Sequence, residues 1–136
     1  MAHVSLVSVV VDDYDRAIAN YVDDLGFELV EDTPAPQDGQ PDKRWVVVQP
    51  AGAGDGAVGL LLARATNERQ RAAIGDQHGG RVGFFLRVDD FAAVEARFVE
   101  RGVEFARPPR DEPYGRVAVF RDAFGNLWDL LGPPPG

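Results

Sequence analysis

The sequence predicts an α+β fold built from two tandem β-α-β-β-β modules. The first observation is that strand-like and helix-like patterns of apolar residues alternate along the chain in this order. The second is an internal repeat, because VVVDDYDRAIANYVDDLGFEL (9–29) and FLRVDDFAAVEARFVERGVEF (85–105) share one layout. Each contains a strand, an Asp-Asp pair, an aromatic residue, an amphipathic helix, a glycine and a second strand. We therefore expect one supersecondary unit to occur twice.

In the first module, β-branched residues dominate 4–11, which predicts a strand that ends at Asp12-Asp13. Apolar residues then recur at helical spacing from Tyr14 to Leu25. A carboxylate of the Asp-Asp pair can cap this helix, and Gly26 can end it in the left-handed conformation. Further strands are expected at 27–31, 44–49 and 57–63, with a proline-rich loop at 34–42 and a flexible turn at 51–56.

The second module repeats this order after a polar connector at 64–79, which can hold a short helix before Gly75. A strand is expected at 81–88. Asp89-Asp90 then precede a helix whose apolar face carries Phe91, Val94, Phe98 and Val99, and Gly102 ends it. Strands follow at 103–106, 116–121 and 126–131, with a loop at 108–114, a tight turn at 122–125 and a frayed tail at 132–136.

Length and charge restrict the possible functions. The chain has 136 residues, a size that suits a single domain over 1–136 with modules at about 4–63 and 80–131. Its formal net charge of −8 disfavours nucleic-acid and membrane-surface partners and favours cationic ligands at long range. The absence of cysteine excludes disulfides and thiolate metal sites. No secretory signal or membrane-length apolar run is visible, so a cytoplasmic location is expected.

The repeat, together with VFRDAFGNLWDLL near the end of the chain, resembles the vicinal oxygen chelate superfamily. This group includes glyoxalase I, extradiol dioxygenases, and bleomycin- and fosfomycin-resistance proteins. The segment 119–131 is similar to the family's turn and final strand, with Ala123 where proline is usual. The resemblance covers about residues 4–131. It implies curved sheets around a cleft, a small-molecule ligand and a homodimer.

Family members that do chemistry hold a divalent metal through His, Gln or Glu. Carried over by resemblance, the four ligand positions fall on Leu6, near Leu60, on Gly83 and on Asp129. Only Asp129 has a donor atom, and one carboxylate does not hold a catalytic metal tightly. His3 and His78 lie outside these positions, and an exposed loop is the expected place of His78. No metal cofactor is therefore expected, while a metal held by other ligands remains an alternative.

Other residues could line a pocket in place of the metal. Side chains alternate along a strand, so Phe85 and Arg87 share a face, and Asp129 shares one with Leu127 and Leu131. The resemblance implies that the loop 107–115 lies at the pocket mouth. Arg110 and Tyr114 could then bind a carboxylate or phenol there, or could belong to a solvated loop with internal ion pairs. Asp129 could be a structural ion-pair partner or a general base. The predicted ligand-binding residues are Trp45, Phe85, Arg87, Arg110, Tyr114 and Asp129, with core packing as the alternative role of Trp45 and Trp128.

Two functions are compatible with these residues. The first is a protein of the bleomycin-resistance type that binds a small apolar or aromatic molecule in a metal-free cleft, at a dimer interface. The second is a lyase, isomerase or dioxygenase of the superfamily that acts on a small oxygen-rich substrate. It would use either a divalent metal or acid–base chemistry by the candidate catalytic residues Asp129 and Tyr114. A regulator or partner subunit without a ligand is a third possibility.

Overall fold

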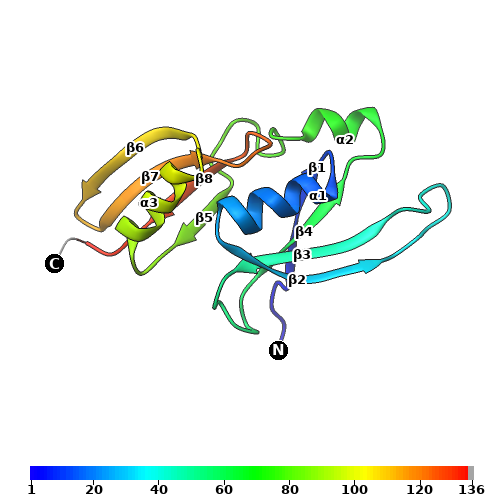
Figure 1. Cartoon of the computed structure of the whole chain (residues 1–136), viewed down its shortest axis with the longest axis horizontal. Coiled ribbons are helices and arrows are strands. Elements are labelled where there is room, and N and C mark those ends of the chain that lie inside the picture. Colours follow the sequence, from blue (N-terminus) through cyan, green and yellow to red (C-terminus); the bar gives the residue numbers. More distant parts are fainter. Residues whose placement is uncertain (135–136) are drawn as a thin grey trace. The chain divides into compact units, whose positions relative to one another are not determined.

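The computed structural model describes residues 1–134, which form two compact units. Unit 1 is Met1–Ile74 and unit 2 is the chain from Gly75 onward. Figure 1 shows that each unit contains one sheet and the helices that belong to it. Part of the predicted frayed tail, 135–136, lies outside the described residues. Gly132, at its start, is ordered by a backbone hydrogen bond of 2.8 Å to the Arg116 carbonyl.

Unit 1 contains a four-stranded mixed sheet with strand order β1-β4-β3-β2. The parallel pair is β1 and β4, while β3 runs antiparallel to both β4 and β2. The first helical segment is continuous and changes from α-helix to π-helix after Ile18. The elements are β1 (Leu6–Val11), α1 (Tyr14–Ile18), the π-helical η1 (Ala19–Asp24), β2 (Phe27–Pro34), β3 (Arg44–Pro50), β4 (Gly59–Arg64) and α2 (Glu68–Ala73).

Unit 2 repeats the topology of unit 1. Its sheet has the order β5-β8-β7-β6, again with one parallel pair, β5 and β8, beside two antiparallel pairs. The elements are β5 (Phe84–Arg87), α3 (Phe91–Glu100), β6 (Phe105–Glu112), β7 (Gly115–Arg121) and β8 (Leu127–Leu131). The predicted α+β fold with two tandem β-α-β-β-β modules is confirmed.

The same local interactions start the main helix of each unit. Asp13 accepts a hydrogen bond from the Arg16 amide at 2.7 Å, and Asp90 accepts one from the Ala93 amide at 3.1 Å. These carboxylates satisfy amide groups that have no partner within the first turn of a helix. The aromatic residue after each Asp-Asp pair also lies under an arginine. Arg44 lies 5.1 Å from the Tyr14 ring centroid, and Arg116 lies 5.5 Å from that of Phe91.

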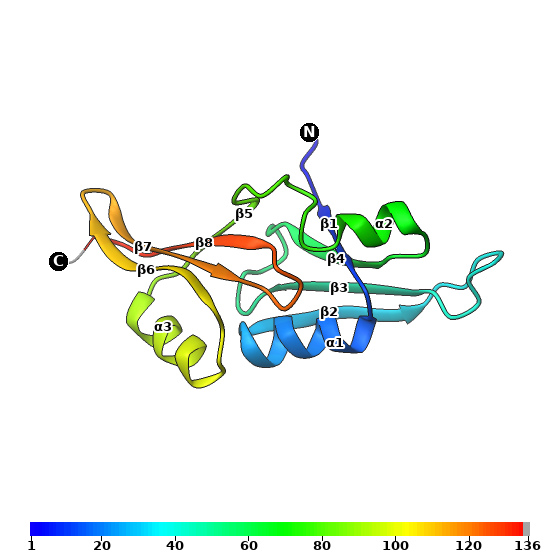
Figure 2. The ribbon, with the colours of Figure 1, turned by 90° about the horizontal axis from the view of Figure 1, so that it is seen from above.

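Each sheet buries one face against its own helix. Figure 2 shows α1 along one face of the unit 1 sheet and α3 along one face of the unit 2 sheet. In unit 2, the Phe98 ring of α3 lies 4.8 Å from that of Phe120 in β7. Alternation along the strands places the other side chains on the opposite, open face, where Phe85 is 65% exposed. Side chains on these open faces are therefore available to a ligand.

Three predicted segments and one predicted helix-face position are wrong, and edge strands explain two of the segments. The predicted loops at 34–42 and 108–114 are partly strand, since β2 extends to Pro34 and β6 to Glu112. Each of these strands pairs with a neighbour on one side only. Proline has no N–H to donate, and it is tolerated there because the other edge of the strand has no neighbouring strand to bond. The strand expected at 81–88 is confined to β5, because the chain before it is turn and bend. Val99 was expected on the packed face of α3 but is 66% exposed.

Candidate functional site

The open face of the unit 2 sheet forms a cavity of about 390 Å³. This volume lies within the range of small-molecule sites. The cross-strand register places its side chains in two rows, each of which spans all four strands. At about 4.8 Å per strand, a row is about 14 Å long. One row is Phe85, Asp129, Val119 and Arg107, and the other is Arg87, Leu131, Val117 and Arg110.

A β-bulge in β6 brings two arginines to the same face of the sheet. Arg107 pairs with Val119 and Arg110 pairs with Val117, so three steps on β6 match two steps on β7. The extra residue lies in the Pro108-Pro109 segment. In a regular strand, residues three apart point to opposite faces. The bulge corrects this parity, and both arginines line the cavity.

The ionisable groups of this cavity are arranged asymmetrically. Asp129 lies in the central strand β8, while Arg87 lies on one edge strand and Arg107 and Arg110 lie on the other. Burial raises the pKa of Asp129, and the charges of Arg107 and Arg110 act in the opposite direction. Arg110 donates a hydrogen bond of 2.7 Å to Glu112, and this bond raises the pKa of Arg110. Among residues 1–134, no ion pair joins Arg87 or Arg107 to a carboxylate.

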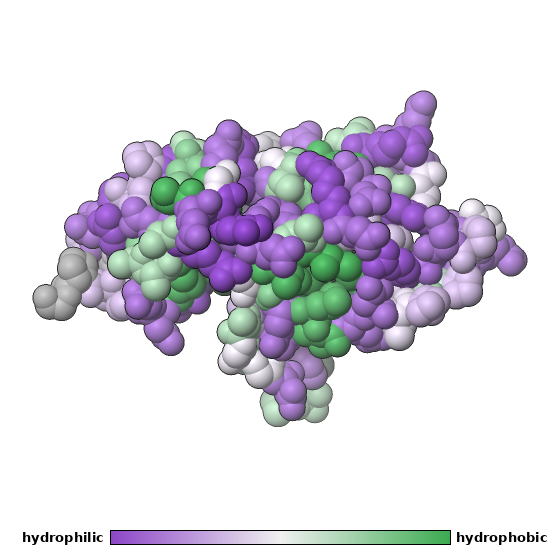
Figure 3. All heavy atoms as spheres, in the orientation of Figure 1, coloured by the Kyte–Doolittle hydropathy of each residue, from purple (hydrophilic) through white to green (hydrophobic). Residues whose placement is uncertain are grey.

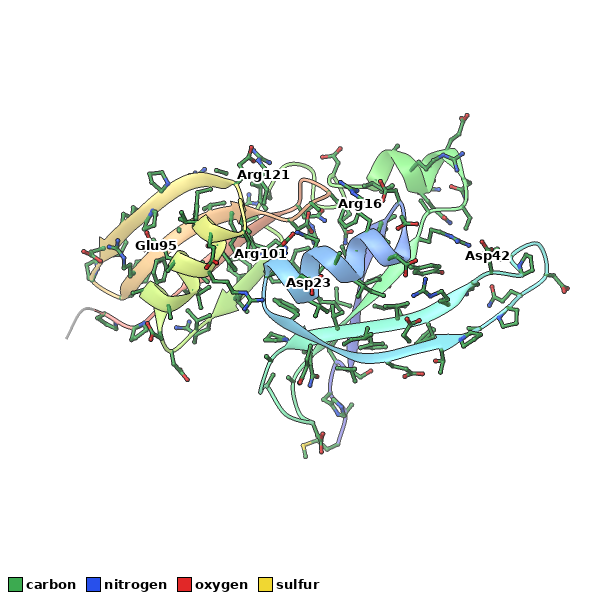
Figure 4. All side chains as sticks on the ribbon, in the orientation of Figure 1. Arg16, Asp23, Asp42, Glu95, Arg101 and Arg121 are labelled. Atoms are coloured by element: carbon green, nitrogen blue, oxygen red, sulfur yellow. The ribbon has the colours of Figure 1, made fainter. Side chains whose placement is uncertain are left out.

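Unit 1 has a cavity of about 320 Å³ beside its own sheet. Trp45 lines it and is 37% exposed. Two further lining residues, Arg44 and Arg64, lie 5.1 and 4.8 Å from the Tyr14 ring centroid. Both guanidinium groups are paired with carboxylates. Arg44 bonds Asp32 at 2.8 Å and Asp15 at 2.9 Å, and Arg64 bonds Asp42, which is labelled in Figure 4, at 2.8 Å.

The residues at the family's metal-ligand positions do not fit a metal. The register pairs Val47 of β3 with Leu61, as it pairs Val119 of β7 with Asp129, so Leu61 is the counterpart of Asp129 in unit 1. This agrees with the expected position near Leu60, and Leu60 itself is buried. Leu61 is equally unable to bind a metal. Within residues 1–134, no three His, Asp or Glu side chains converge as a metal site would require.

Gly83, at the corresponding position of unit 2, has its side-chain space filled by another residue. A Cβ atom built on Gly83 would overlap the His78 imidazole. That imidazole also packs edge-on against Phe84, with the ring centroids 4.9 Å apart. His78 was expected in an exposed loop, but it is half-buried and packed against the start of β5. It does not line the cavity that contains Asp129.

The structure brings five of the six predicted ligand-binding residues together. Only Trp45 lies elsewhere, in the cavity of unit 1. Trp128 is a core residue, stacked on Phe84 at 4.6 Å and on Phe120 at 5.7 Å. Arg107 is a pocket residue that the sequence does not reveal, because the pattern after Ala106 predicts a loop and not the bulge that turns Arg107 into the cavity. The five are Phe85, Arg87, Arg110, Tyr114 and Asp129.

The surface carries both polar and apolar side chains outside these cavities. Figure 3 shows one largely hydrophilic face, with an apolar area over β2, where Leu29 and Val30 are 42% and 52% exposed. In the described part of the chain, every helix is too short or too polar to cross a lipid bilayer.

Comparison with known proteins gives relatives over almost the full length of the chain. A protein of Shewanella frigidimarina is 51% identical over 125 residues, which is 92% of this chain and 89% of the relative. The crystal structure of UcmS2 has a TM-score of 0.80 and 30% identity, and the match covers 96% of this chain and 98% of that one. TnmS3, described as an antibiotic binding protein from Streptomyces sp. CB03234, has a TM-score of 0.74 and 35% identity. That match covers 98% of this chain and 97% of TnmS3.

The family assignment follows from these matches and from the fold. The model of the Glyoxalase/Bleomycin resistance protein/Dioxygenase superfamily matches residues 1–130. The paired β-α-β-β-β modules are those expected from the resemblance. The chain therefore belongs to the glyoxalase/bleomycin resistance protein/dioxygenase superfamily.

Proposed function

We propose that this protein is a cytoplasmic homodimer that binds a small, largely aromatic molecule without a metal. The observation that carries the proposal is the cavity of unit 2, with its apolar floor of Val117, Val119 and Leu131 and the exposed ring of Phe85. Such a cavity, with an apolar floor flanked by charged side chains, suits an aromatic ligand better than a sugar. The likeness to TnmS3, an antibiotic binding protein, supports the same class of function.

The donor set supports binding without a metal. Leu6, Leu61 and Gly83 stand where the family's metal ligands are expected, and none has a side-chain donor. The His78 ring fills the space beside Gly83, so a ligating side chain could not be introduced there without moving it. Binding energy must then come from apolar contact, stacking and hydrogen bonds.

The proposal is tested by ligand screening of chelator-treated protein. A library of neutral polycyclic aromatic molecules is titrated, and the shift in melting temperature and the tryptophan fluorescence are recorded. We expect hits whose affinity does not change when Mn²⁺, Fe²⁺, Ni²⁺ or Zn²⁺ is added. Phe85→Ala should weaken the hits about tenfold, since it removes the exposed ring from one end of the cavity.

Val99→Ala is the matched control, because Val99 is apolar and 66% exposed but lies on α3. It should leave the affinities unchanged. A library without hits, or hits that need a divalent metal, would contradict the proposal.

Acid–base catalysis is the second candidate function, because Asp129 and Tyr114 line the same cavity. Burial raises the pKa of Asp129, as a general base requires. Under this alternative, a bound molecule would be converted during incubation, and Asp129→Asn would abolish conversion while binding persists. Mass spectrometry of each hit after incubation separates the two functions. Hits recovered unchanged favour binding alone.

A further inference from the structure

We propose that the unit 2 cavity selects aromatic molecules that carry an anionic group, a carboxylate or a phenolate. This inference rests on the proposed function and specifies the ligand class of the same site. The proposed ligand is an anion, whereas the net charge of −8 favours cations at long range. The local arrangement of charges decides, because a bound ligand meets the groups at the cavity and not the mean charge of the chain.

Arginines lie on both edges of the cavity. Arg87 lies in β5, one edge strand of the sheet, and Arg107 and Arg110 lie in β6, the other edge strand. Arg87 and Arg110 end one cross-strand row, and Leu131 and Val117 form the apolar stretch between them. An aromatic body on this stretch would place its charged substituent beside a guanidinium at either end. Guanidinium groups bind carboxylates through two parallel hydrogen bonds.

The charge of these arginines is only partly neutralised within the protein. Glu112 accepts a hydrogen bond of 2.7 Å from Arg110. Asp129 attracts Arg107 and Arg110 through space, and Tyr114 interacts with Arg110. Within the described chain, no carboxylate forms an ion pair with Arg87 or Arg107. Two guanidinium groups are thus left for an anion.

Unit 1 offers an internal comparison, because it has the same fold and a cavity of similar size. Its Arg44 and Arg64 are held by Asp15, Asp32 and Asp42 and lie against the Tyr14 ring. They serve the structure of unit 1 and are not available to a ligand. The two repeats therefore differ in that the arginines of the unit 1 cavity are all held by carboxylates, whereas over residues 1–134 Arg87 and Arg107 of unit 2 are not.

Asp129 is expected to oppose this binding. Its carboxylate lies in the floor between the two arginine edges and repels an anion that approaches Arg107 or Arg110. Removing its charge should therefore tighten anion binding, whereas it should weaken the binding of a cation. This opposite response separates a charge effect from damage to the site.

Three naphthalene derivatives test the inference: 2-naphthoate, naphthalene-2-carboxamide and 2-naphthylmethylammonium. They share the same ring system and carry one substituent that is anionic, neutral or cationic, respectively. Isothermal titration calorimetry at neutral pH and low salt should give the highest affinity for the anion, about tenfold above the neutral amide, and the lowest for the cation. The preference should decrease in 0.5 M NaCl, because salt screens partly exposed charges.

Substitutions of single charged residues show which side chains cause the preference for the anion. Arg87→Ala and Arg107→Ala should each weaken 2-naphthoate binding about tenfold and leave the carboxamide within about threefold. Asp129→Asn should strengthen naphthoate binding about threefold. Arg97→Ala is the matched control, since it removes the same charge from an exposed position on α3, across the sheet from the cavity. Melting temperatures confirm that each variant is folded.

The affinities of the three probes for the wild-type protein and the variants decide whether the cavity selects anions. A naphthoate preference that is lost in Arg87→Ala and Arg107→Ala but kept in Arg97→Ala supports the inference. Equal affinities, or a preference for the ammonium probe, would overturn it and leave small-molecule binding intact. A preference that Arg97→Ala reduces as much as Arg87→Ala would also overturn it, because net charge would then be the cause. If no probe binds, the inference fails, and the neutral library decides separately on the proposed function.

Discussion

Single residues decide the chemistry of the unit 2 cavity. Asp129 is the clearest case, because a carboxylate in the central strand of a sheet is partly removed from water. Its position could be predicted from the sequence by strand alternation and by the family's turn motif. Arg110 was also among the predicted pocket residues, but Arg107 was not, because its place in the cavity depends on a bulge in the distant strand β6.

The Asp129→Asn variant should be more stable than the wild-type protein at neutral pH. Burial raises the pKa of Asp129 above the ordinary value of 3.8 that it regains on unfolding, so the folded state binds its proton more tightly. The stabilising contribution of the protonated group is complete below about pH 3.8 and is lost as the pH rises through the higher folded-state pKa. The amount by which the free energy of unfolding of Asp129→Asn exceeds that of the wild-type protein should therefore grow from pH 3.5 to pH 7.

Urea unfolding of both proteins across this pH range measures the difference in the free energy of unfolding. Other carboxylates titrate in both proteins and cancel in this difference. A difference that stays constant would show that folding does not shift the pKa of Asp129, and one that grows toward acid pH would show that the carboxylate is favoured by its surroundings.

Secondary-structure elements follow the sequence pattern where local chemistry decides them. The Asp-Asp caps, the helix starts and the turn at 122–125 could be predicted because short-range hydrogen bonds form them. The extent of β6 could not, because proline disfavours strands in general and is tolerated here only at the edge of a sheet. Sheet order and bulges depend on partners far along the chain, which local patterns do not specify.

The turn before β8 depends on the buried carboxylate of Asp122. It accepts hydrogen bonds from the Phe124 amide at 2.9 Å, the Asn126 amide at 2.9 Å and the Asn126 side chain at 2.8 Å. Asp122→Ala should lower the free energy of unfolding by about 3 kcal/mol, because it leaves these donors without their acceptor. Chemical denaturation measures the change.

Asp111→Ala is the control, since Asp111 is exposed and forms a surface ion pair of 2.9 Å with Arg116. It should cost less than about 1 kcal/mol. Equal losses in the two variants would mean that the turn does not depend on the carboxylate of Asp122.

The whole molecule combines two copies of one topology with different side chains. The copies share their sheet order, their capped helices and the arginine that lies over the first aromatic residue of each helix. Their open faces differ, since Leu61 in unit 1 corresponds to Asp129 in unit 2. A shared fold thus coexists with distinct binding chemistry.

The assembly is expected to be a homodimer, as the family resemblance implies. Phe85 and Trp45 are 65% and 37% exposed on open sheet faces, and apolar side chains in such positions favour cover by a ligand or a second chain. Size-exclusion chromatography with light scattering at micromolar concentration should return twice the chain mass of 14.8 kDa. A single species at the chain mass would exclude a stable dimer under these conditions.

The central claim, that the open face of unit 2 binds an aromatic molecule without a metal, is tested most directly by methyl NMR. Chelator-treated protein labelled at its Val and Leu methyl groups is titrated with naphthalene-2-carboxamide, and ring currents shift nearby methyl signals. We expect saturable shifts at Val117, Val119 and Leu131, which form the cavity floor. Shifts that are absent from these residues, or that occur only after a divalent metal is added, would contradict the claim.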